Sequence, residues 1–152
     1  MTDKTAEIIR ELQISYNMEI ETVINYLANS EHLDGVRAAE IKKSLAAEIQ
    51  EELTHALQLA KRIKTLGGTV PGSMELKMDQ AVMQPPKDPT DVISVIRGVI
   101  AAEDAAIAQY NKIIRLCDGV DYVTQDLAIT LLGDEEEHRR LYRGYLTEYT
   151  KG

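Results

Sequence analysis

Four long stretches of the chain repeat apolar residues at steps of three and four, and a glutamate interrupts each of these stripes. This period places the stripe on one face of an α-helix. We expect helices over about 3–29, 36–66, 88–117 and 121–149, the third beginning at Asp88-Pro89 or a residue or two later. The inward glutamates are Glu19, Glu52, Glu103 and Glu135. Converging buried carboxylates repel one another, and a bundle of these helices can tolerate them if a polyvalent cation lies between them.

The connections between these stretches are unequal in length. Short breaks join the first helix to the second and the third to the fourth, which predicts two antiparallel hairpins. A longer segment, GGTVPGSMELKMDQAVMQPPKDP, lies between the hairpins and is long enough to cross the whole bundle. Ser73–Met83 contains no proline and many helix formers, so we expect a short helix there. The predicted fold is an all-α four-helix bundle of two hairpins joined by a long crossover.

The two predicted hairpins carry the same pattern. The second and fourth helices each contain Glu-x-x-His, as Glu52–His55 and Glu135–His138. This spacing puts both side chains on one helical face. The first and third helices each contain a glutamate followed seven positions later by a tyrosine: Glu19 and Tyr26, Glu103 and Tyr110.

A pseudo-twofold pair of such hairpins predicts two metal positions. Each position has one terminal glutamate and one histidine, and both share two glutamates, so the expected metal ligands are Glu19, Glu52, His55, Glu103, Glu135 and His138. A mixed oxygen and nitrogen set with open positions suits iron or manganese better than a closed zinc site. We expect Tyr26 and Tyr110 to hydrogen-bond the opposite glutamates, and both could also supply an electron during oxidation; the alternative is that they are core tyrosines whose hydroxyl has a partner.

Composition excludes several other classes of protein. The 152 residues fit one domain over 1–152, and the net charge of −8 argues against nucleic-acid binding through a basic surface. Cys117 is the only cysteine, so neither an internal disulfide nor a cysteine-rich metal site is expected. The chain lacks an apolar run long enough for a signal peptide or a membrane span, so we expect a cytoplasmic protein.

The stretch DYVTQDLAITLLGDEEEH, from Asp121 to His138, resembles the fourth helix of bacterioferritin, and Asn25-Tyr26 and Glu52-x-x-His55-Ala56 also match. The resemblance to this branch of the ferritin-like di-iron carboxylate superfamily covers all four helices. It implies two irons per subunit, bridged by Glu52 and Glu135, with Glu19 and Glu103 as terminal ligands. It also implies oxidation of Fe(II) by dioxygen or hydrogen peroxide, catalysed by Glu19, Glu52, Glu135 and Tyr26, for iron storage and oxidative-stress protection.

Three features depart from bacterioferritin. Leu53 stands where the family places its haem-ligating methionine, so we expect no haem at that site. Only a short stretch of the chain follows His138, and the crossover is long. In these two features the chain resembles the proteins that form the smaller Dps-like shells. The implied homo-oligomer therefore ranges from a dimer to a shell of 12 or 24 subunits.

Two other functions fit the same residues: a rubrerythrin-like peroxidase without a rubredoxin domain, and a non-enzymatic helical scaffold. Outside the six ligands, Glu48 shares the stripe of Glu52, and we expect it to be solvated or paired. The alternatives are an extra metal ligand and a carboxylate on the entry path of the metal. Glu51, Glu136 and Glu137 are expected to form a charged outer face.

Overall fold

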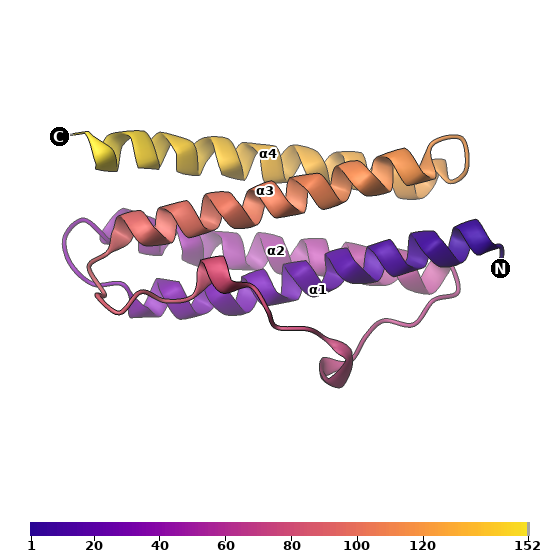
Figure 1. Cartoon of the computed structure of the whole chain (residues 1–152), viewed down its shortest axis with the longest axis horizontal. Helices are drawn as coiled ribbons and strands as arrows, with labels where there is room; N and C mark the ends of the chain where they lie inside the picture. Colours follow the sequence, from indigo (N-terminus) through magenta and orange to yellow (C-terminus); the bar gives the residue numbers. More distant parts are fainter. Residues whose placement is uncertain (152) are drawn as a thin grey trace.

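The computed structural model describes residues 1–151 and contains four long helices and no strand in that range (Figure 1). The helices are α1 (Asp3–His32), α2 (Ala39–Thr65), α3 (Val92–Cys117) and α4 (Tyr122–Thr150). Helix α1 packs along α2, α3 packs along α4, and α1 contacts α3. The predicted four-helix bundle of two hairpins is confirmed.

Side-chain caps determine where three of the helices begin. Thr2, Asp91 and Asp121 each accept a hydrogen bond from a backbone N–H one turn into α1, α3 and α4. Helix α3 therefore begins at Val92, later than its predicted start, because Asp88 accepts a hydrogen bond from the Thr90 amide in the preceding turn. None of helices α1 to α4 is apolar enough over 18 residues to cross a membrane, within the range described.

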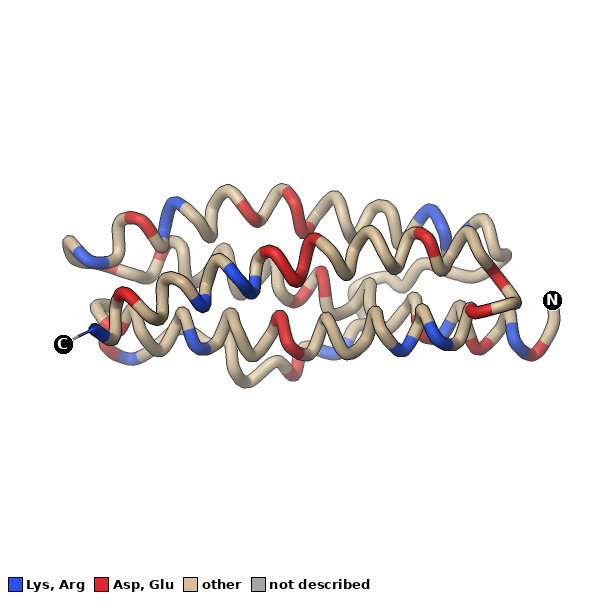
Figure 2. Tube along the Cα trace, turned by 90° about the horizontal axis from the view of Figure 1, so that it is seen from above, with Lys and Arg blue, Asp and Glu red and all other residues tan. Residues whose placement is uncertain are grey.

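The buried apolar side chains form two clusters, one toward each end of the bundle, and the inward glutamates lie between them. The first cluster includes Tyr26, Leu45, Ile96, Val99 and Tyr142. The second cluster includes Ile8, Leu12, Leu59, Tyr110 and Leu131. The glutamates are therefore placed at mid-length of the bundle, where acidic residues appear on several helices (Figure 2).

The crossover between α2 and α3 does not contain the helix expected over Ser73–Met83. It has two short 3₁₀ turns instead, η1 (Ser73–Glu75) and η2 (Ala81–Met83). The physical reason is that α1 side chains take the backbone hydrogen bonds of this segment. Asn17 both donates to and accepts from the backbone of Lys77, at 2.8 and 2.7 Å. Asn29 Nδ2 donates to the carbonyl of Met83 at 2.7 Å.

Close approach of the crossover to α3 depends on Gly98. A Cβ atom at this position would lie 2.2 Å from the carbonyl oxygen of Val82, which is inside van der Waals contact. The absence of a side chain at Gly98 lets Met83 pack into the first cluster, where it is 1% exposed. The crossover is thus held against both α1 and α3.

Candidate metal centre

The six predicted ligand side chains converge between the helices. Helices α1 and α3 contribute one glutamate each, and α2 and α4 contribute a glutamate and a histidine each. None of the four glutamates is more than 3% exposed, and His55 and His138 are 2% and 6% exposed. The structure therefore brings together every residue of the predicted set: Glu19, Glu52, His55, Glu103, Glu135 and His138.

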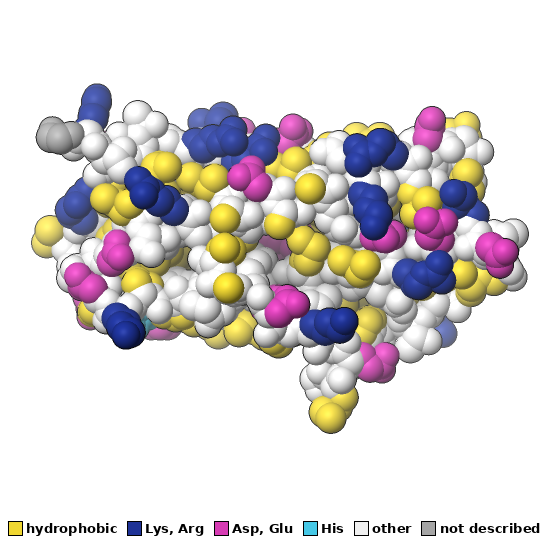
Figure 3. Space-filling view, viewed as in Figure 1, with side chains coloured by type: hydrophobic (Ala, Val, Ile, Leu, Met, Phe, Trp, Pro, Cys, Tyr) yellow, Lys and Arg dark blue, Asp and Glu magenta, His cyan; other side chains and the backbone are white. Residues whose placement is uncertain are grey.

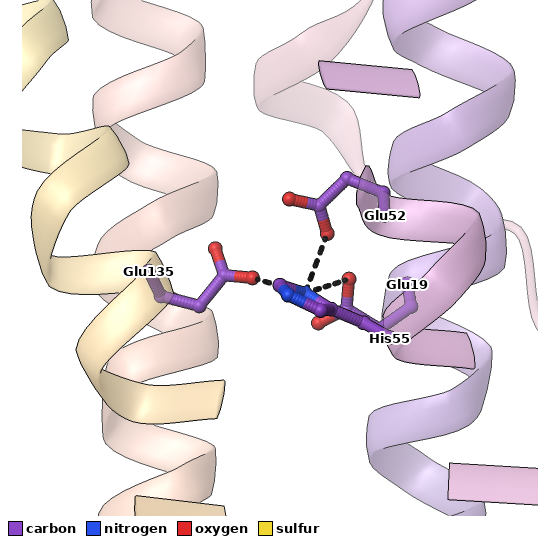
Figure 4. Close-up of side chains that lie close together, drawn as sticks. All are labelled: Glu19, Glu52, His55 and Glu135. Carbon is purple, nitrogen blue, oxygen red and sulfur yellow. Dashed lines mark hydrogen bonds and ion pairs between the residues drawn. The ribbon is translucent and has the colours of Figure 1, made fainter. Parts of the chain in front are cut away.

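One group surrounds Nδ1 of His55 (Figure 4). This nitrogen lies 3.1 Å from Oε1 of Glu135 and 3.7 Å from Oε2 of both Glu19 and Glu52. Candidate ligand atoms of the four residues lie within 4.8 Å of one another, which is compact enough to enclose one cation.

A second group surrounds Nδ1 of His138. This nitrogen lies 3.3 Å from Oε1 of Glu52, 3.8 Å from Oε2 of Glu135 and 3.9 Å from Oε1 of Glu103. Glu52 and Glu135 therefore belong to both groups, and each directs one carboxylate oxygen toward His55 and the other toward His138. Two adjacent positions with two shared carboxylates result, which is the geometry of a two-metal site.

Several buried atoms at this centre lack any hydrogen-bond partner. They are Oε2 of Glu19, Oε1 of Glu52, Oε2 of Glu103 and Nδ1 of His138. An unpaired buried carboxylate oxygen is costly, and two cations would satisfy these atoms. The residues present therefore fit a pair of metal ions.

Without metal, protons neutralise the charge of the centre. Burial, followed by repulsion from Glu52, raises the pKa of Glu19 well above its usual range, and burial likewise raises the pKa of Glu103. Burial alone would lower the pKa of His138, but the nearby carboxylates of Glu135 and Glu52 raise it to about 12. Divalent cations would take the place of these protons.

Tyr26 and Tyr110 make the predicted cross-bundle hydrogen bonds. Tyr26 Oη donates to Oε1 of Glu103 at 2.6 Å, and Tyr110 Oη donates to Oε1 of Glu19 at 2.7 Å. Burial raises the pKa of both phenols, so they remain protonated donors. Each terminal glutamate is thereby oriented by a tyrosine from the other hairpin.

Two outer carboxylates orient the histidines, and sequence reasoning did not find their role. Nε2 of His55 lies 3.0 Å from Oδ2 of Asp134, and Nε2 of His138 lies 2.8 Å from Oε2 of Glu51. These contacts turn Nδ1 of each ring toward the centre. Glu51 is exposed, as expected, but it is more than part of a charged face. One feature of the sequence points to this role: an acidic residue directly precedes each shared glutamate, Glu51 before Glu52 and Asp134 before Glu135.

The expectation that Glu48 is solvated or paired is wrong. Its side chain is 6% exposed, and its Oε2 atom has no hydrogen-bond partner. The α2 helix points this carboxylate into the bundle one turn before Glu52, where neighbouring helices exclude water. Glu136 and Glu137 are exposed, as expected.

Comparisons with known proteins agree with this geometry. Residues 9–151 match the ferritin-like domain. The chain is 28% identical over 137 residues to the DNA protection during starvation protein of Pyrococcus furiosus, covering 88% of this chain and 74% of that protein. It is 26% identical over 141 residues to bacterioferritin of Desulfovibrio desulfuricans, covering 92% and 74%. A dodecameric thioferritin from Bacteroides fragilis, described as bacterioferritin-related, superposes with a TM-score of 0.85 at 26% identity, covering 95% of this chain and 87% of that one. Because the family match spans nearly the whole chain, the protein belongs to the ferritin-like family.

Proposed function

We propose that the chain is a ferroxidase, which binds two Fe(II) ions as substrate and oxidises them with dioxygen or hydrogen peroxide. The observation that carries this proposal is the sharing of Glu52 and Glu135 between the two histidine-centred groups. Shared carboxylates hold two ions close enough to give up electrons to one oxidant together.

The residues of the centre have separate roles in this proposal. Glu52 and Glu135 set the separation of the two ions, while Glu19 and Glu103 each complete one position. The bound ions supply the electrons for the reaction. Four carboxylates in a water-poor interior stabilise the higher charge of Fe(III) relative to Fe(II). Tyr26 donates its hydrogen bond to Glu103 and keeps that ligand in place.

Iron storage or detoxification, together with oxidative-stress protection, is the biological role that follows from this chemistry. The related proteins include a bacterioferritin and a dodecameric thioferritin, so we propose a homo-oligomer between a dimer and a shell of 12 or 24 copies of this one ferritin-like domain. We propose no haem at the site that bacterioferritins use, because Leu53 stands there and offers no ligand atom.

DNA binding is not part of the proposal, although one relative is named for DNA protection. The formal net charge is −8. Basic and acidic side chains are interspersed on the face shown in Figure 3, so that face has no continuous basic surface for phosphates.

Anaerobic addition of Fe(II) followed by air tests the proposal. The wild-type protein should develop di-ferric absorbance, and Glu52→Ala should abolish it. Glu136→Ala is the matched control, because Glu136 is an exposed acid on α4 next to a ligand. Equal oxidation rates in the wild type and in Glu52→Ala would contradict the proposal.

A further inference from the structure

The two hairpins correspond residue by residue around the centre, and this correspondence exposes one difference. The shared glutamates Glu52 and Glu135 occupy equivalent places on α2 and α4. One turn before them, α2 carries Glu48 and α4 carries Leu131. At the position one turn before the shared glutamates, therefore, only the α2 side carries a carboxylate.

The layers that close the two ends of the centre differ in the same way. Beyond His138, the layer is polar: Tyr142 follows His138 by one turn, and its hydroxyl donates to Oγ of Ser44 at 3.1 Å. Beyond His55, the equivalent positions are all leucine. The polar set is Ser44, Glu48 and Tyr142, and the equivalent apolar set is Leu127, Leu131 and Leu59.

Glu48 lacks the compensation that a buried carboxylate normally has. It is 6% exposed, its Oε2 atom has no partner, and it forms no salt bridge within residues 1–151. Burial raises its pKa to about 7, and His138 is the charged neighbour that opposes this shift most. The Tyr142–Ser44 hydrogen bond holds this part of α2 beside the His138 end of α4, so the Glu48 carboxylate lies on the His138 side of the centre. A divalent cation at that position would compensate this buried carboxylate.

We propose that Glu48 makes the two metal positions unequal, so that a divalent cation binds more tightly at His138 than at His55 and occupies that position first. This inference rests on the two-metal centre of the proposed function. A carboxylate in a water-poor interior attracts a nearby divalent cation strongly, and Leu131 supplies no such attraction at the other end. Ser15, the unpartnered polar residue before Glu19, is neutral and does not balance Glu48.

Anaerobic titration of the whole protein with Co(II), followed by visible absorption, measures the two binding steps without turnover. The wild type should show two steps whose dissociation constants differ by at least about tenfold. Glu48→Leu copies the residue at the equivalent position and should weaken the first step by about tenfold while leaving the second unchanged. Glu48→Gln removes the charge at constant size and should behave in the same way.

Single-position variants assign the steps. His55→Gln should retain the tight step, and adding Glu48→Leu should weaken it. His138→Gln should retain only the weak step, and Glu48→Leu should not change it. Two equal steps in the wild type, or a difference that survives both Glu48 variants, would overturn the inference while leaving the two-metal centre intact. A wild-type protein that binds no Co(II) would overturn both.

Discussion

The α1–α2 and α3–α4 hairpins can be compared position by position, because each contributes one terminal glutamate, one shared glutamate and one histidine. At these positions the two hairpins are equivalent, down to the tyrosine that each sends to the other's terminal glutamate. One turn away the equivalence ends, since Glu48 faces the centre on α2 and Leu131 does so on α4.

The difference between Glu48 and Leu131 shows which positions metal binding requires to be the same in both hairpins and which positions can differ. The ligand atoms repeat because two ions need matched ligands. The neighbouring layers supply none of the six predicted ligands, so they can differ, and Glu48 lies in one where Leu131 lies in the other. Exchanging equivalent residues between the hairpins therefore tests which features belong to the centre itself.

The largest effect is expected at the shared glutamates. Glu52→Ala and Glu135→Ala should each weaken binding of Co(II) by more than about 100-fold, because either change removes a ligand from both positions. Calorimetry under anaerobic conditions measures this loss. The two variants should agree within a few-fold, and a large loss in one alone would show that the hairpins are not equivalent at these positions.

The outer carboxylates should have the next largest effect. Glu51→Gln and Asp134→Asn keep the side-chain size but weaken the hydrogen bond to Nε2 of His138 and His55. Each should lower metal affinity about 10- to 100-fold. Glu137→Gln, an exposed acid paired with Arg140, is the control. Unchanged affinity in both outer variants would rule out a role in orienting the histidines.

Metal binding should release protons and weaken as the pH is lowered. The raised pKa values of Glu19, Glu103, His55 and His138 mean that the metal-free centre holds protons on these four groups. Two ions should displace up to about four protons, and each released proton makes the affinity fall about tenfold per pH unit of acidification. Calorimetry in buffers of different ionisation enthalpy counts them. Affinity that stays constant between about pH 6 and pH 8 would contradict this protonation state.

The smallest effect is expected in the crossover, whose backbone accepts side-chain hydrogen bonds from α1 of one hairpin but only packs against α3 of the other. Asn29→Ala removes the hydrogen bond to the carbonyl of Met83, whereas the equivalent α3 residue is the apolar Ile113. The free energy of unfolding should fall by about 1–3 kcal/mol, because a buried carbonyl loses its partner. Urea denaturation measures the change. Asn111→Ala, which removes only a hydrogen bond within α3, should cost less.

The helices and the ligand set were predictable from the sequence, because both depend on local spacing. A step of three places Glu52 and His55 on one face of any helix, and the repeated pattern in the second hairpin identifies the partner face. The crossover was not predictable in the same way. Ser73–Met83 has helical propensity, but Asn17 and Asn29 take its backbone hydrogen bonds, and these contacts exist only after folding.

The roles of three acidic residues could not be predicted from the sequence either: Glu48, Glu51 and Asp134. All three lie on helices whose faces were predicted, yet their roles depend on atoms from the opposite hairpin. Glu51 is exposed, and only the position of His138 gives it a function. Glu48 is buried because the other helices exclude water around it, and a stripe of residues on one helix does not reveal this exclusion.

Diffraction from crystals soaked in Fe(II), recorded at the iron absorption edge, tests the two-metal centre most directly. We expect two anomalous peaks about 3.5–4 Å apart, one beside Nδ1 of His55 and one beside Nδ1 of His138, with Glu52 and Glu135 in contact with both. A single peak, or iron bound only outside the four helices, would contradict a centre built from two equivalent hairpins.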